Sequence, residues 1–183
     1  MKENGNTANQ YEVTRRLAQE NEALRRKLAR HEFRQLEREL TSEDPFKLEI
    51  HAPSEDVAPD IALPPVEDIL LPRLPVPLGS IQRESLVADL PVIAVYDDRL
   101  SGNRLAAALM GLLRMQYRAP FARLVFLCSS FEAVPLLGRY GFVVEQVGRA
   151  DPASFLTRLY RRYGATQIRS VGTGELIAER DGD

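Results

Sequence analysis

Cysteine is nearly absent from this chain of 183 residues, and so is any long apolar run. The single cysteine, Cys128, excludes an internal disulfide framework. No run approaches the roughly 20 apolar residues that span a bilayer, so we expect no membrane insertion. The opening residues lack the apolar core of a secretory signal, and no lipidation pattern is visible. The sequence therefore predicts a soluble protein of a bacterial-type cytoplasm.

An excess of charge of one sign and the usual catalytic signatures are also missing. The formal net charge of −2 argues against a protein that coats nucleic acid or an anionic membrane. Neither a GxGxxG dinucleotide fingerprint nor a phosphate-binding P-loop is present. Both histidines, His31 and His51, precede the predicted C-terminal domain, which therefore lacks a Ser/His or Cys/His pair and the ligands of a zinc site. The sequence identifies no cofactor and predicts no metal site.

Residues 10–41 are predicted to form one long helix, preceded by a disordered segment over residues 1–9. Between about Gln10 and Leu40 the chain contains no proline or glycine, and strong helix formers occupy almost every position. An isolated helix of this polarity would bury little surface, so its apolar residues are expected to have a partner.

The apolar residues of this helix predict a coiled coil. Leu17, Leu24 and Leu28 recur at the spacing of seven and four that marks a coiled-coil seam, and Asn21 lies on the same seam at an a position. An asparagine at an a position pairs with its own copy across a parallel dimer, at some cost in stability. We therefore expect the chain to associate with itself as a parallel coiled-coil dimer through Leu17, Asn21, Leu24 and Leu28.

After His31 the seam changes phase. Phe33, Leu36 and Leu40 keep the spacing of three and four on a shifted face, which predicts a stutter or a change of partner near His31. The alternative for the whole segment is an amphipathic helix that packs on its own C-terminal domain. Its arginines are interleaved with acidic residues, unlike the continuous positive charge of a DNA-binding basic region, so we do not expect nucleic acid as a partner.

Residues 42–80 are predicted to be an acidic, proline-rich linker. This segment holds eight prolines and eight acidic residues. Proline removes amide donors and carboxylates repel one another, so we expect an extended chain. The apolar clusters at Ile61–Leu63 and Val66–Leu71 are consistent with packing along the domain, with binding of a partner protein, or with incidental hydrophobic residues.

Residues 81–183 are predicted to form one α/β domain. Near-continuous apolar runs at Val92–Tyr96, Leu124–Cys128 and Phe142–Val147 are typical of buried parallel strands. Thr166–Val171 and Glu175–Glu179 flank a Gly-Thr-Gly turn and predict a closing antiparallel hairpin. The alternation of strands and helices predicts a small Rossmann-like or flavodoxin-like three-layer sandwich, mostly parallel, with a terminal β-hairpin and a helix over residues 81–88 before the first strand.

Capping residues predict where the helices of this domain begin and end. Ser101 is the predicted N-cap of a helix that runs to about Tyr117, and Ser129 and Ser130 are the predicted caps of a short helix to Tyr140. The third helix is bounded by a cap, a favoured first-position proline and a terminating glycine, namely Asp151, Pro152 and Gly164.

Polar residues follow the first two strands, at the edge where an open parallel sheet binds its ligands. Helix N-termini at this edge offer free amides to a phosphate or carboxylate. The alternative is that these Ser and Asp residues only cap helices. The candidate ligand-binding residues are Asp97, Asp98, Ser101, Asn103 and Arg104 after the first strand, and Cys128, Ser129 and Ser130 after the second.

The pair Asp97-Asp98 resembles the acidic pair of response-regulator receiver domains. The resemblance covers one strand and its end. The third strand ends in Gly148 rather than an aspartate acceptor, and no lysine follows Lys47, so phosphoryl transfer of that type is not implied. The resemblance implies at most a degenerate receiver fold.

The oligomerisation helix and the missing catalytic constellation together predict a function. We expect an oligomeric interaction, scaffold or regulatory protein that presents an α/β domain to another protein, and no enzymatic activity. The alternative is a nucleotide- or nucleotide-sugar-binding module, or a transferase-type enzyme, that uses the crevice at the carboxyl ends of the first two strands, with Asp97 or Asp98 as base or metal ligand.

Overall fold

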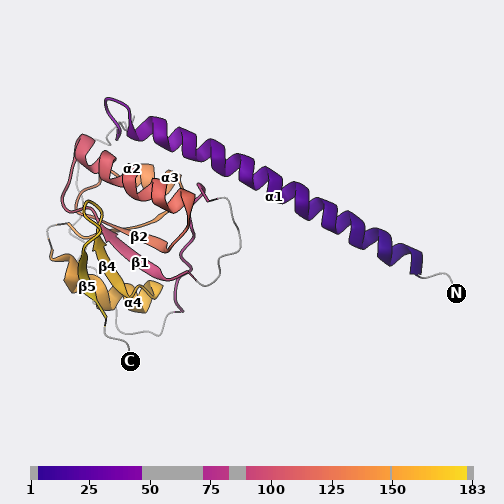
Figure 1. The fold of residues 1–183 in the computed structure, drawn as a ribbon. Helices are drawn as coiled ribbons and strands as arrows, with labels where there is room; N and C mark the ends of the chain where they lie inside the picture. Colours follow the sequence, from indigo (N-terminus) through magenta and orange to yellow (C-terminus); the bar gives the residue numbers. More distant parts are fainter. Residues whose placement is uncertain (1–3, 47–71, 83–89, 149, 181–183) are drawn as a thin grey trace, which may run out of the picture.

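The computed structural model describes residues 4–46, 72–82, 90–148 and 150–180, with side chains from residue 11 onwards. The expected apolar clusters of the linker, and residues 83–88 of the helix expected before the first strand, lie outside this part of the chain. A long N-terminal helix leads into one α/β domain (Figure 1).

Helix α1 extends over 37 residues, Asn4–Leu40, and its N-terminal half projects beyond the domain (Figure 1). The helix includes residues 4–9, which belong to the segment predicted to be disordered. No proline occurs there, and a helix once nucleated extends readily into such neighbours. The helix ends where the hydroxyls of Thr41 and Ser42 donate to the carbonyls of Glu37 and Glu39, at 2.7 and 2.8 Å.

Five strands form one sheet in the order β3-β2-β1-β4-β5. β1 to β4 are parallel, and β5 pairs antiparallel with β4 in the expected hairpin, so the prediction of a mostly parallel sheet with a terminal hairpin is confirmed. The order reverses between β1 and β4, and the polar loops at the carboxyl ends of these two strands therefore lie side by side. The strands are Val92–Tyr96 (β1), Arg123–Cys128 (β2), Val143–Gln146 (β3), Gln167–Ser170 (β4) and Leu176–Glu179 (β5).

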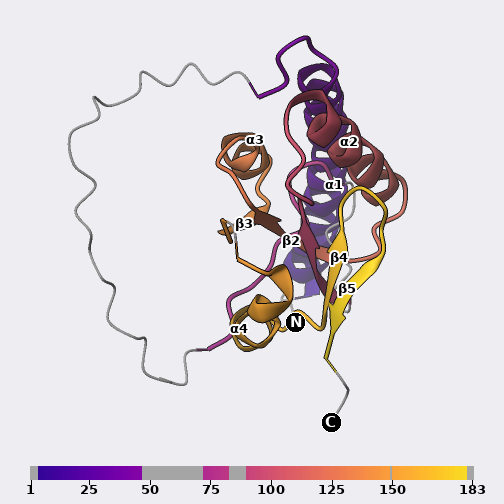
Figure 2. The ribbon, with the colours of Figure 1, turned by 90° about the vertical axis from the view of Figure 1, so that its left-hand side faces the viewer.

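Helices cover both faces of the sheet (Figure 2). Alternate residues of a strand point to opposite faces, so Val95 of β1 contributes to one apolar cluster and its neighbour Ala94 to the other. The first cluster is covered by α2, α3 and the end of α1, and the second by α4 and the short 3-10 helix η1 before it. The domain is a three-layer α/β/α sandwich. Its helices are α2 (Gly102–Arg118), α3 (Val134–Arg139), η1 (Pro152–Phe155) and α4 (Leu156–Tyr163).

The predicted boundaries of the third helix are confirmed. Asp151 accepts a hydrogen bond from the amide of Ala153 at 3.1 Å, and Pro152 follows at the first helical position. Gly164 ends α4 with φ 77°, a left-handed conformation that glycine adopts without steric cost.

The other two caps differ from their prediction. Ser101 stands at the N-cap of α2, but its side chain makes no capping bond. The amide of Gly102 donates instead to the carboxylate of Glu132, at 2.8 Å. α3 begins at Val134, later than predicted, so Ser129 and Ser130 do not cap it. At α2 the carboxylate of Glu132, which is distant in the sequence, replaces the local cap. Before α3 a longer loop separates the two serines from the start of the helix.

The last turns of α1 pack on the domain. Phe33 stacks on Tyr117 of α2 with ring centroids 3.8 Å apart, and Leu36 is fully buried in the same cluster. Burial of each such side chain contributes about 1.5–3 kcal/mol. The apolar residues after the change of phase predicted near His31 therefore contact the chain's own domain, which is the alternative expected for this helix. The buried residues of this seam are Ala29, Phe33, Leu36 and Leu40.

Candidate functional site

The projecting half of α1 carries exposed leucines. Every residue from 11 to 28 is exposed, and Leu17, Leu24 and Leu28 are 60%, 64% and 57% exposed. These three residues, here named the leucine stripe, occupy the positions predicted for the coiled-coil seam. Apolar side chains aligned on one exposed face mark an interaction surface.

The leucine stripe faces away from the chain's own domain. At 100° per residue, its centre lies about 130° around the helix from the centre of Phe33, Leu36 and Leu40, which contact the domain. The domain therefore cannot cover the stripe by the contact that holds the rest of the helix. Asn21 lies between Leu17 and Leu24, exposed like them.

Asp97 lies at the carboxyl end of β1 and is 5% exposed. One of its oxygens, Oδ2, accepts hydrogen bonds from the amide and the hydroxyl of Ser129, at 2.7 and 2.9 Å. The other oxygen accepts from the amide of Arg99 at 3.0 Å. The carboxylate therefore links the end of β1 to the end of β2. Ser129 binds Asp97 and does not form the predicted helix cap. Its acceptors are largely occupied, which suits a structural role more than that of a base.

Asp98 makes the corresponding link to β4. Its Oδ2 accepts from the hydroxyl of Ser170 at 2.6 Å and from the amide of Gly172 at 2.9 Å. A Cβ at Gly172 would lie 3.2 Å from this oxygen, so glycine permits the close approach. Asp98 and Arg99 both have φ 55°, a left-handed conformation that non-glycine residues adopt only when their surroundings hold them there.

Cys128 is buried at the end of β2. Burial, with a smaller contribution from the Asp97 carboxylate, raises the pKa of its thiol to about 12. The nucleophilic form of cysteine is the thiolate, so this thiol is protonated and unreactive at neutral pH. The position of Cys128 is explained by packing in the core of the sheet.

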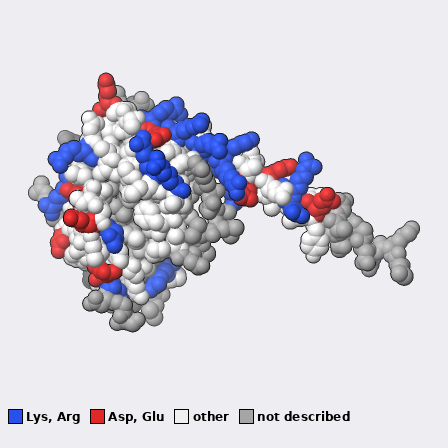
Figure 3. Space-filling view, in the orientation of Figure 1, with Lys and Arg blue, Asp and Glu red and all other residues white. Residues whose placement is uncertain are grey.

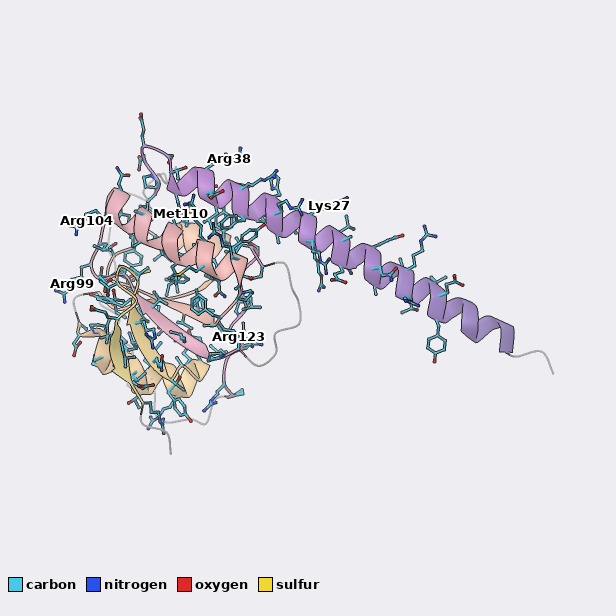
Figure 4. The ribbon with its side chains drawn as sticks, viewed as in Figure 1. Lys27, Arg38, Arg99, Arg104, Met110 and Arg123 are labelled. Carbon is cyan, nitrogen blue, oxygen red and sulfur yellow. The ribbon has the colours of Figure 1, made fainter. Side chains whose placement is uncertain are left out.

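An open hollow of about 720 Å³ lies beside the point where the strand order reverses. Two of the predicted residues, Asp98 and Arg104, line it, whereas Ser101, Asn103 and Ser130 are exposed outside it. Figure 4 shows Arg104 at the start of α2, pointing outwards. The remaining lining comes from α2, the loop before it and the β4–β5 hairpin, through Leu100, Ala107, Ala108, Ser170, Gly172, Thr173, Glu175, Leu176 and Ile177.

The hairpin residues of this hollow were not predicted as part of the site. Thr173 donates its hydroxyl to Ser170 at 2.9 Å, and its amide donates to the same oxygen at 2.9 Å, so the turn is tightly bonded. The hairpin residues join the hollow because β4 pairs with β1, and the sequence alone does not show this pairing. The signal in the sequence was the Ser-Val-Gly-Thr-Gly segment that begins at the end of the fourth strand.

The described residues contain no group of three or more His, Cys, Asp or Glu side chains that could hold a metal ion. Among the helices of that same part of the chain, none is both long and apolar enough to cross a membrane. Comparison with protein families, curated proteins and solved structures finds no match for this chain.

Proposed function

We propose that the protein is a homodimeric interaction protein. Residues 14–31 of α1 form a parallel coiled coil with a second copy, and the two α/β domains are held outside it to contact another protein. The observation that supports this proposal is the leucine stripe, which is exposed at heptad spacing on a face that the chain's own domain leaves uncovered.

Charges beside the seam favour a parallel arrangement in register. In heptad notation Glu20 and Lys27 occupy g positions, and Arg25 and Glu32 occupy the e positions of the following heptads. In a parallel dimer each g residue meets the next e residue of the second copy, which pairs Glu20 with Arg25 and Lys27 with Glu32. Both pairs join opposite charges. An antiparallel arrangement would also place Asn21 against a leucine instead of its own copy.

The seam also has a natural end. The next a and d positions after His31 are Gln35 and Arg38, and neither supplies an apolar contact. From Phe33 onwards the apolar residues face the domain instead. Each domain is therefore held about 130° around the helix from the coiled coil, which leaves room for the second helix.

Sedimentation velocity of the full chain over a range of concentrations tests the dimer. We expect the wild-type chain to sediment as a dimer and Leu24→Glu to sediment as a monomer, because a carboxylate would be buried at the seam. Gln19→Glu adds the same charge at an exposed position off the seam and is expected to remain dimeric. A monomeric wild type, or equal loss of the dimer in both variants, would contradict the proposal.

The hollow beside the strand reversal supports a second candidate function, the binding of a nucleotide or nucleotide-sugar. The order of the four parallel strands, 3-2-1-4, is that of the first four strands of the Rossmann fold, in which ligands bind at this reversal. The hollow combines the Arg104 guanidinium with apolar walls. A thermal-shift screen of nucleotides and nucleotide-sugars, with and without magnesium, tests it. A shift that is lost in Arg104→Ala is expected, and the absence of any shift would exclude this candidate.

A further inference from the structure

Four basic side chains line up on one side of the C-terminal half of α1, although the two signs alternate in the sequence. Lys27, Arg30, Arg34 and Arg38 recur at intervals of three and four residues, which aligns them on one side. Glu32, by contrast, lies half-buried on the flank near Tyr140. Figure 4 shows Lys27 and Arg38 pointing away from the domain.

Helix α2 adds two arginines beside this row. Tyr117 stacks on Phe33, and one turn earlier Arg114 pairs with Glu37 at 2.8 Å, so α1 and α2 run antiparallel in contact. Arg118 follows Arg114 by one turn, and α2 contains no acidic residue. Lysine and arginine side chains gather where α1 crosses α2 (Figure 3). All six cations are exposed and are here named the basic face: Lys27, Arg30, Arg34, Arg38, Arg114 and Arg118.

Within the described residues of a single copy, most of these cations have no carboxylate partner, and in the proposed dimer Lys27 also faces Glu32 of the second copy. Within the described residues, Arg114 is the one member of the basic face that pairs with a carboxylate. An open hollow of about 640 Å³ between the two helices is lined by Arg34, Arg38 and Arg114, together with His31, Glu37 and Thr41. A local excess of positive charge in a chain of net charge −2 attracts polyanions to this one surface.

We propose that the basic face binds the phosphodiester backbone of a nucleic acid duplex. Five of its six residues are arginines, whose planar guanidinium can donate two parallel hydrogen bonds to one phosphate. The four cations of α1 extend along about 17 Å of helix, which suits a row of phosphates better than a single anion. Among the described residues, no strand or helix end projects from the basic face to enter a groove of the duplex. The proposed contact is therefore with the phosphodiester backbone and independent of base sequence.

An anionic membrane fits the same surface less well. Helices that lie on lipid place apolar side chains beside their basic residues and insert them between the headgroups. His31 and Gln35, which are polar, lie beside the cations of the last turns, and in the proposed dimer the second copy covers the leucine stripe that lies beside Lys27. The basic face also follows the crossing of two helices and does not form a single apolar–basic stripe.

Fluorescence anisotropy of a labelled DNA duplex of arbitrary sequence, titrated with the full chain, tests the proposal. Neutralising four to five phosphates predicts a slope of about −3.6 to −4.5 in a plot of log affinity against log salt, or a loss of roughly 150- to 500-fold between about 50 and 200 mM salt. Arg34→Ala/Arg38→Ala is expected to reduce the slope by about two and to weaken binding at low salt at least tenfold.

The control variant is Arg15→Ala/Arg161→Ala, which removes two exposed arginines away from the basic face and is expected to bind like wild type. Circular dichroism confirms that each variant is folded. The proposal is overturned if the duplex does not bind at low salt, or if both double variants lose affinity equally. It is also overturned if vesicles containing phosphatidylserine bind through Arg34 and Arg38 while the duplex does not.

Discussion

The two halves of α1 use the same residue types at the same spacing and yet differ in what covers them. Leu36, in the half beside the domain, is fully buried, whereas Leu24, in the projecting half, is 64% exposed. The two apolar faces are about 130° apart around one continuous helix. A shift of the seam near His31 is therefore enough for one helix to present different faces to two partners, one its own domain and the other, in our proposal, a second copy.

The largest expected effect is on the half that contacts the domain. Leu36→Ala leaves a cavity in the apolar cluster under α1 and is expected to lower the free energy of unfolding by about 2–5 kcal/mol in urea denaturation. Leu24→Ala, in samples dilute enough to be monomeric, is expected to change it by less than about 0.5 kcal/mol. Equal costs at the two positions would show that the projecting half is also covered within the monomer.

The next effect is on the seam of the projecting half. Asn21→Leu removes a polar side chain from the proposed interface, where burial without full hydrogen bonding costs about 1–3 kcal/mol. We expect association to tighten by about tenfold or more, with larger oligomers appearing in sedimentation because the asparagine no longer selects two strands. Gln19→Leu, off the seam, is the control. Unchanged association of Asn21→Leu would argue that this residue lies outside the interface.

A smaller effect is expected from the charges that flank the seam. Glu20→Arg and Arg25→Glu each replace two attractive contacts of the parallel dimer by two repulsive ones, for a loss of about 1–2 kcal/mol, or roughly 5- to 30-fold in affinity. An equal mixture of the two variants restores opposite charges at both contacts and should form a heterodimer. Failure of the mixture to associate better than either variant alone would rule out the parallel register while leaving the dimer itself intact.

The smallest effect is expected for the ion pair between α1 and α2. Glu37 and Arg114 are 34% and 48% exposed at their side chains, and exposed pairs of this kind contribute about 0–1 kcal/mol. Glu37→Gln should therefore lower the free energy of unfolding by less than about 1 kcal/mol, with a loss that shrinks further at high salt. A cost close to that of Leu36→Ala would mean that charge, rather than apolar contact, holds the helix on the domain.

The strands and the hairpin could be predicted because their signals are local. Apolar runs such as Val92–Tyr96 match the observed strands to within one or two residues, and Asp151 and Gly164 act as the predicted cap and stop. These signals lie within a few residues of the feature they specify, so no tertiary contact is needed to interpret them.

The candidate site could be predicted only in part, because its contacts are tertiary. Ser129 has the chemistry of a helix cap, but the carboxylate of Asp97 on the neighbouring strand binds it instead. Ser170 joins the site because β4 lies next to β1, which depends on the strand order. The change of phase after His31 is visible in the sequence. The contact of the later apolar residues with the chain's own domain depends on tertiary packing, which the sequence alone does not specify.

The paired aspartates after β1 determine how this edge of the sheet can open. Asp97 bonds to the end of β2 and Asp98 to the end of β4, so the loop is held on both sides at once. It cannot open on its own, since any opening must break contacts to two strands of the core. We therefore expect the amide hydrogens of this loop to exchange together with the slowest, most cooperative part of the fold rather than with the surface, and this edge of the sheet to be among the last regions to unfold.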